Sequence, residues 1–161
     1  MPTNDSILRY DAALPASQAD IARFLRAEIE VALPKALSRV WHGHPVWFDG
    51  ENPIVGYDAR KSSVNILFWN GQALGEPGLA AVGKYRAAGK QFEHASEIDR
   101  AELRRCLKKA RTNFFDGVTY FRKLREAAKR RKAAAAVPSR GKSNPGKRAT
   151  KASAKSRRSR A

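Results

Sequence analysis

Apolar residues follow a helical spacing near the start of the chain. Over residues 17–33 they recur three and four positions apart, the spacing that places side chains on one face of a helix. That face consists of Ile21, Phe24, Leu25, Ile29 and Ala32. Ser17 and Asp20 have the spacing of a capping box at the start of this helix. Residues 1–16 show no such period, so we expect them to form an N-terminal lead-in.

The middle of the chain has the pattern of strands joined by turns. Residues 63–69 alternate in polarity and predict a strand. Its buried face would consist of Val64, Ile66 and Phe68. Residues 45–48 and 53–57 flank an Asp-Gly-Glu-Asn turn signal, which predicts a hairpin. A further strand is expected near Tyr85 and Phe92.

Three more segments predict helices. Pro34 fits the first position of a helix, so residues 34–40 are predicted to form a second short helix. Asp99 and Glu102 repeat the capping-box spacing. The buried stripe of the helix that they begin would be Leu103, Leu107, Ala110 and Phe114. Gly117 interrupts the pattern. The last helix would then present Val118, Phe121, Leu124 and Ala128 on one face and run out into the Lys129–Lys132 cluster. The alanines at positions 133–136 would extend it as readily as they would fray, so its end stays open.

These patterns predict an α+β domain, the body, over residues 17–128. Its centre would be an antiparallel sheet of three to five strands, packed by N-terminal and C-terminal helices. Residues 129–161 form a Lys/Arg-rich tail, and beyond Pro138 no apolar residue is larger than alanine. Because such a segment buries too little surface to offset the entropy of ordering, we expect the tail to be disordered.

Charge is segregated between the body and the tail. The 161 residues include 32 Lys plus Arg and 15 Asp plus Glu, a net charge of +17. Thirteen of the basic residues and none of the acids lie in residues 129–161, which leaves the body and lead-in a net charge of +4. A tail of this kind attracts phosphates through counterion release, without sequence preference. We therefore predict weak, non-specific binding of DNA or RNA. The predicted contacts are Lys129, Arg130, Arg131, Lys132, Arg140, Lys142, Lys147, Arg148, Lys151, Lys155, Arg157, Arg158 and Arg160.

Two other interpretations of the tail stay open. A cationic segment could serve only to keep the protein in solution, and it would also be attracted to an anionic membrane surface. The tail contains no aromatic residue, so base stacking by the tail is not expected.

A set of spaced residues in the middle of the chain resembles a known family. The set consists of Trp41, Pro45, Phe68-Trp69-Asn70-Gly71, Leu74, Pro77, Gly83-Lys84 and Arg86. With the helical segments on either side, this pattern is similar to the YdhG-like family of small bacterial domains of unknown function, over residues 17–115. The resemblance implies an α+β fold with an antiparallel sheet covered by helices. One branch of the family is described as a frataxin-like iron chaperone, which implies an alternative function as an iron or small-ligand carrier with an incidental tail. Frataxin-like iron handling uses clustered surface carboxylates, whereas the acids here are scattered, so the fold carries over better than the function.

Aromatic and basic residues of the body form a candidate ligand pocket. Amphipathic aromatic rings often line clefts for flat or apolar ligands, and nearby cations could hold an anion. The candidate residues are Trp41, Trp47, Trp69, Tyr85, Lys84 and Arg86. The alternative is that the rings belong to the hydrophobic core and that the cations form a solvated edge.

His42 and His44 form a candidate metal site. Histidines two positions apart on a strand lie on the same side and could share a divalent metal, although a third ligand is required. The alternative is a loop in which both imidazoles form hydrogen bonds with the backbone.

Other classes of function find little support. Cys106 is the single cysteine, which excludes an intramolecular disulfide and a multi-cysteine zinc site, and its helical position predicts a buried thiol. Residues 1–10 lack an apolar signal segment and no run of 18 apolar residues occurs, so we expect a cytoplasmic protein, associated with the nucleoid through its tail, without a membrane span. No paired carboxylates or nucleophile–base spacing indicate an enzyme, and no cofactor is predicted. The body is predicted to bind a small ligand or a protein partner, and the oligomeric state stays open.

Overall fold

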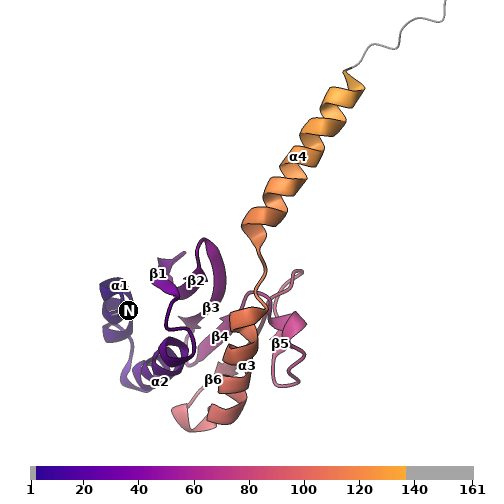
Figure 1. Cartoon of the computed structure of the whole chain (residues 1–161). Coiled ribbons are helices and arrows are strands. Elements are labelled where there is room, and N and C mark those ends of the chain that lie inside the picture. The colour runs from indigo at the N-terminus through magenta and orange to yellow at the C-terminus, as the bar shows by residue number, and fades with distance from the viewer. Residues whose placement is uncertain (1–2, 137–161) are drawn as a thin grey trace, which may run out of the picture. The chain divides into compact units, whose positions relative to one another are not determined.

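The computed structural model describes residues 3–136 (Figure 1). The helices are α1 (Asp5–Ala12), α2 (Ala16–Ala32), α3 (Arg100–Thr112) and α4 (Gly117–Ala135), with short 3-10 helices η1 (Gly71–Leu74) and η2 (Ala95–Glu97). The strands are β1 (Leu37–Trp41), β2 (His44–Asp49), β3 (Asn52–Ala59), β4 (Val64–Phe68), β5 (Ala80–Ala81) and β6 (Ala88–Phe92). The chain divides into two units, residues 1–124 and 125–161, and α4 begins in the first and continues in the second.

The strands form one antiparallel sheet in the order β1-β2-β3-β4-β6-β5, which confirms the predicted α+β class. The sheet has six strands, where three to five were predicted. One reason is that residues 37–41 pair along their whole length with β2, so the helix predicted over residues 34–40 is wrong. Pro34 instead lies in the turn that leads from α2 into β1. The other reason is β5, whose two residues are too short to give a sequence pattern.

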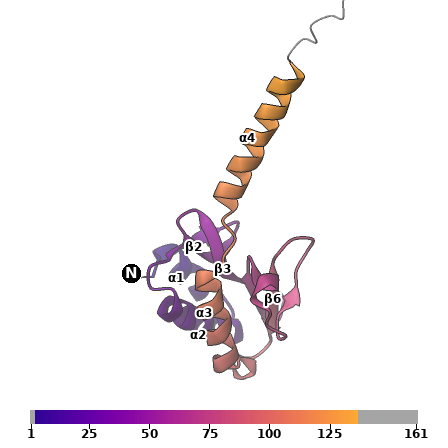
Figure 2. The same ribbon diagram turned by 45° about the vertical axis from the view of Figure 1, so that its right-hand side comes forward.

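The core lies between one face of the sheet and helices α1, α2 and α3. Alternate residues of the strands supply the sheet side of this core, because side chains of a strand point to opposite faces in turn. They include Trp47, Val55, Tyr57, Ile66 and Phe68, each at most 1% exposed. Figure 2 shows α2 and α3 side by side, and the predicted apolar stripes of both helices face the core, including Leu25, Ile29 and Leu107.

Two predictions about the start of the chain differ from the structure. The lead-in of residues 1–16 contains α1, whose Ile7 is fully buried in the core and whose first turn is capped by the side chain of Asn4. The capping box at Ser17 is not formed, because α2 begins one residue earlier, after Pro15, and no side chain caps it. The capping role predicted for Asp99 is confirmed at the start of α3, where its carboxylate accepts from Ala101 N at 2.8 Å.

The predicted last helix runs through the basic cluster. Helix α4 continues through Lys129 to Ala135, so the tail boundary predicted at residue 129 falls within a helix. Four consecutive alanines follow Lys132, and alanine has the highest helix propensity of all residues. The rest of the predicted tail, residues 137–161, lies outside the described residues. None of the helices in residues 3–136 is both long and apolar enough to cross a membrane.

Candidate functional site

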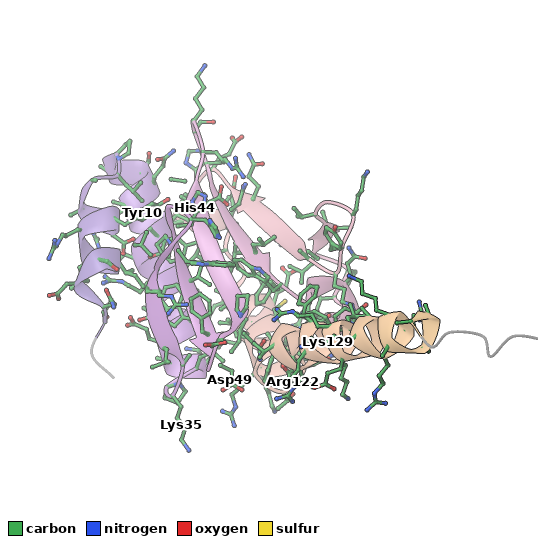
Figure 3. All side chains as sticks on the ribbon, turned by 90° about the horizontal axis from the view of Figure 1, so that it is seen from above. Tyr10, Lys35, His44, Asp49, Arg122 and Lys129 are labelled. Carbon is green, nitrogen blue, oxygen red and sulfur yellow. The ribbon has the colours of Figure 1, made fainter. Side chains whose placement is uncertain are left out.

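Helix α4 carries a dense set of cations. It contains seven Lys or Arg residues and one acid, Glu126. The cations are Arg122, Lys123, Arg125, Lys129, Arg130, Arg131 and Lys132, and all seven side chains are exposed. Within residues 3–136 none of them forms an ion pair. Arg122 and Lys129 are labelled on this helix in Figure 3.

The helical conformation decides how these charges are presented. Successive residues of an α-helix are rotated by about 100° and rise by about 1.5 Å. The four cations at positions 129–132 therefore point in four directions within one turn, about 4.5 Å long. A helix of this kind presents positive charge around its circumference, and its diameter with side chains is close to the width of the DNA major groove.

The start of α4 is fixed by a carboxylate. Asp116 precedes the helix, and its Oδ1 accepts from the backbone N of Thr119 at 3.0 Å and from Asn52 Nδ2 at 3.2 Å. The bond from the Thr119 backbone holds the pKa of Asp116 below its usual value. The cap satisfies an N–H group that the helix itself leaves without a partner.

Four of the six cations of α3 serve a different purpose, because they form ion pairs. Arg100 and Arg104 both pair with the carboxylate of Glu28 on α2, at 3.0 and 2.6 Å. Lys109 pairs with Glu76 at 2.7 Å and holds the pKa of that carboxyl below its usual value. These ion pairs join α3 to its neighbours, so the paired basic residues of α3 differ in role from the basic residues of α4, which form none in the described chain.

Sequence reasoning missed part of this cationic helix. The predicted contacts began at Lys129, whereas Arg122, Lys123 and Arg125 belong to the same exposed helix. The signal was present, because the predicted last helix up to residue 128 already had three cations and one acid. The predicted boundary at residue 129 follows the last acid, Glu126, and therefore divides the cations of one helix.

The structure separates the tryptophans of the predicted pocket. Trp47 is 1% exposed and packs against Tyr57 in the core, with ring centroids 5.7 Å apart. Trp41 and Trp69 are half-buried and pack against each other at 6.0 Å, with their planes at 45°. The prediction that Trp47 contacts a ligand is therefore wrong. Of the three tryptophans predicted to line one pocket, the structure brings only Trp41 and Trp69 together.

The remaining residues of the predicted pocket lie on the loop between β5 and β6. Lys84, Tyr85 and Arg86 are all exposed, and Tyr85 is 86% exposed. The loop is attached to η1 by Gln72, whose backbone N donates to the Arg86 carbonyl at 2.9 Å and whose side chain donates to the Tyr85 carbonyl. The Arg86 guanidinium lies 4.5 Å from the ring centroid of Phe115.

Two cavities in the described chain are lined by other residues. One of about 270 Å³ is lined by the apolar residues Leu33, Phe48 and Ile54 and also by Arg111. Another, of about 330 Å³, lies along β3, β4 and β6 and includes Asp58 and Asn65 in its lining. Neither includes a tryptophan.

The glycine of the Phe-Trp-Asn-Gly segment has a packing role. A Cβ built on Gly71 would lie 2.7 Å from both Cβ and N of Ala88 on β6, so η1 approaches the sheet closely only with glycine there. The preceding Asn70 is buried and donates from Nδ2 to the Asn113 carbonyl at 3.1 Å. The segment thus joins the end of β4 to β6 and to the connection between α3 and α4.

The two histidines lie at the turn between β1 and β2. His42 has a φ of +50° and Gly43 a φ of +83°, which fits a two-residue hairpin loop with positive φ at both positions. His44 is opposite Trp41 in the strand register and is labelled in Figure 3. The predicted arrangement of two histidines on one side of a strand is therefore wrong. In residues 3–136 no group of three or more His, Cys, Asp or Glu side chains could hold a metal ion, so the pair has no third ligand there.

Three further titratable groups are buried in the body. Cys106 is 2% exposed, as predicted, and burial raises the pKa of its thiol to about 11. Tyr57 donates from its hydroxyl to Asp11 Oδ1 at 2.7 Å. Burial raises the pKa of Asp11 and also that of Tyr57. These groups stabilise the core and provide no pair of accessible groups for acid–base chemistry.

A scan against protein-family models, a search of curated proteins and a search of solved structures each found no match to this chain.

Proposed function

We propose that this protein binds nucleic acid without sequence preference through a cationic segment, residues 122–160. The segment consists of the seven cations of α4 and the nine cations that follow at positions 140–160. The single observation that carries the proposal is the exposed basic surface of α4, on which seven cations accompany one acid and none is used in an ion pair within the described chain.

The physical basis is the release of counterions. Each Lys or Arg that neutralises a phosphate releases condensed cations from the nucleic acid, and the affinity gained falls as salt rises. Residues 137–161 lie outside the described residues, so their part in the proposal rests on their sequence. The cations of α3 are not included, because four of them pair with Glu28 and Glu76.

The proposal extends to family and location. We propose that the body belongs to the YdhG-like family, on the spaced residues around Trp41 and Phe68–Gly71, and that the protein acts in the cytoplasm in association with the nucleoid. The alternative function, an iron or small-ligand carrier, is not favoured, because the histidine pair has no third ligand in residues 3–136.

A charge-matched pair of variants tests the proposal. In the first, Lys129, Arg130, Arg131 and Lys132 are replaced by Gln, a residue of similar helix propensity. In the second, four scattered cations of the body are replaced by Gln. These are Arg9, Lys35, Lys61 and Lys108, all exposed and without an ion pair in the described chain.

Both variants lose the same net charge, so a difference between them reports the position of the cations. At about 0.1 M salt, removing one cation that neutralises a phosphate should weaken duplex DNA binding roughly eightfold. We expect the α4 variant to lose affinity by at least that factor, and the scattered variant to lose much less. Equal losses in the two variants would show that net charge alone matters and would refute the proposed site.

A further inference from the structure

The outer face of the sheet, opposite the core, carries an aromatic surface that the cationic segment does not explain. We define it as the Trp41–Trp69 surface, formed by Arg39, Trp41, His42 and Trp69. We infer that this surface stacks against unpaired bases and gives the protein a preference for single-stranded over duplex nucleic acid. The inference rests on the proposed function, because it names the form of nucleic acid that the protein prefers.

The two indoles come from opposite sides of the β2–β3 hairpin. Arg39 and Trp41 are two positions apart on β1, and Arg39 is opposite Val46, which in turn is opposite Gly56. Since strand partners share a face, Val46 and Gly56 form the outer face between β1 and β4. Trp69 directly follows β4, and its backbone N donates to the Ile54 carbonyl at 3.0 Å.

Gly56 allows the two rings to meet. A Cβ at this position would lie 2.6 Å from the Pro45 carbonyl oxygen and 3.3 Å from Cζ3 of Trp69. Because the position has no side chain, the Trp69 ring lies over β3 and comes within 6.0 Å of Trp41. Both rings remain half-buried, whereas Trp47 on the opposite face is 1% exposed.

The groups beside these rings favour an anionic, planar ligand. The guanidinium of Arg39 lies 4.4 Å from the ring centroid of Phe48, and the imidazole of His42 lies 4.3 Å from the ring of Trp41. Both side chains are exposed, and the surface contains no acid. Bases stack on aromatic side chains while basic groups contact the backbone of the strand, which is how proteins bind single-stranded nucleic acid. A duplex keeps its bases stacked in pairs and offers none to such a surface.

The test uses the full chain, a 12-nucleotide oligothymidylate and a duplex of the same length, at about 0.3 M salt, where phosphate contacts are weakened. Trp41→Ala should weaken binding of the single strand about 5- to 140-fold, the range for loss of one stacked base, and leave duplex binding unchanged. Leu37→Ala is the matched control, because Leu37 is an exposed apolar residue on the same strand, 53% exposed, without an aromatic ring. It should change neither affinity.

A second measurement covers the case in which Trp41→Ala does not fold. Arg39→Gln with His42→Ala removes two exposed side chains and should also weaken single-strand binding while sparing the duplex. In the unaltered protein, the single strand should quench tryptophan emission and the duplex should not. A folded Trp41→Ala chain whose single-strand affinity stays within twofold of the original would overturn the inference, as would the absence of quenching.

Failure of this inference is distinguishable from failure of the proposed function. If duplex binding depends on positions 129–132 but Trp41→Ala has no effect, only the stacking surface is refuted. If neither the single strand nor the duplex binds at low salt, the proposed function fails and the inference fails with it.

Discussion

The close approach of η1 to β6 predicts that alanine at position 71 destabilises the fold. The same substitution at Gly117, which has room for a Cβ, should not. Gly71→Ala would place a Cβ 2.7 Å from both Cβ and N of Ala88, and 2.8 Å from its carbonyl oxygen. Carbon atoms in favourable contact are about 3.5–4.0 Å apart, so the backbone of η1 or β6 must shift by close to 1 Å. Overpacking of this kind costs about 1–3 kcal/mol. For a domain of this size we expect Tm to fall by roughly 4–12 °C.

Gly117→Ala is the matched control. Its Cβ would meet Phe115 at 3.5 Å, an ordinary contact, and the position opens helix α4 without a positive φ. Alanine in place of a helical glycine stabilises by about 0.5–1 kcal/mol, so Tm should stay the same or rise. Thermal unfolding followed by circular dichroism measures both variants. If Gly71→Ala melted within about 1 °C of the original chain, well below the shift expected from overpacking, the close packing described for this segment would be wrong.

Three further results are expected. Cys106, at 2% exposure and with a pKa of about 11, should react with a thiol reagent at pH 8 only on unfolding; rapid stoichiometric labelling of the folded chain would contradict its placement. Burial raises the pKa of Asp11, so the folded chain keeps the carboxyl proton to higher pH than the unfolded chain does. Protonated Asp11 therefore contributes stability at low pH, and this contribution is lost as pH rises from the ordinary carboxyl range through the raised pKa. Chemical denaturation across pH measures this effect, and Asp11→Asn should remove the pH-dependent part of the free energy of unfolding that Asp11 supplies. An unchanged pH profile in the variant would contradict the raised pKa of Asp11. Asp99→Ala should lower the free energy of unfolding by about 1 kcal/mol, because α3 loses its N-cap. Asp99→Asn should keep most of this stability, because asparagine also caps helices.

The elements that were predicted well have strong local periods. The stripe of α2 through Ile21 and Ile29, and the alternation of Val64 to Phe68, each fix one face of an element against the core. Such patterns are visible in the sequence because burial acts on residues a fixed distance apart. The capping role of Asp99 was readable for the same reason, since the cap and the groups it satisfies are three residues apart.

The elements and positions that were missed depend on contacts across the sheet, which leave no periodic pattern in their own segment of sequence. Residues 37–41 form β1 because β2 provides hydrogen-bonding partners along its length. Their own sequence has no strand pattern strong enough to override the helix start that Pro34 indicates. The pairing of Trp41 with Trp69 depends on the absence of a side chain at Gly56, which lies on neither element. Trp47 lies in the core because it occupies the other face of the sheet, and the composition of the segment does not distinguish the two faces.

The most direct test of the account is the salt dependence of DNA binding by the full chain. A plot of log affinity against log salt concentration should have a slope of about −5 to −7 if about five to eight cations neutralise phosphates. Replacing Lys129, Arg130, Arg131 and Lys132 by Gln should make the slope less steep by up to about 3.6, which is about 0.9 for each phosphate that the variant no longer neutralises. A slope in the original chain weaker than about −2, or the same slope in both chains, would contradict binding through the cationic segment.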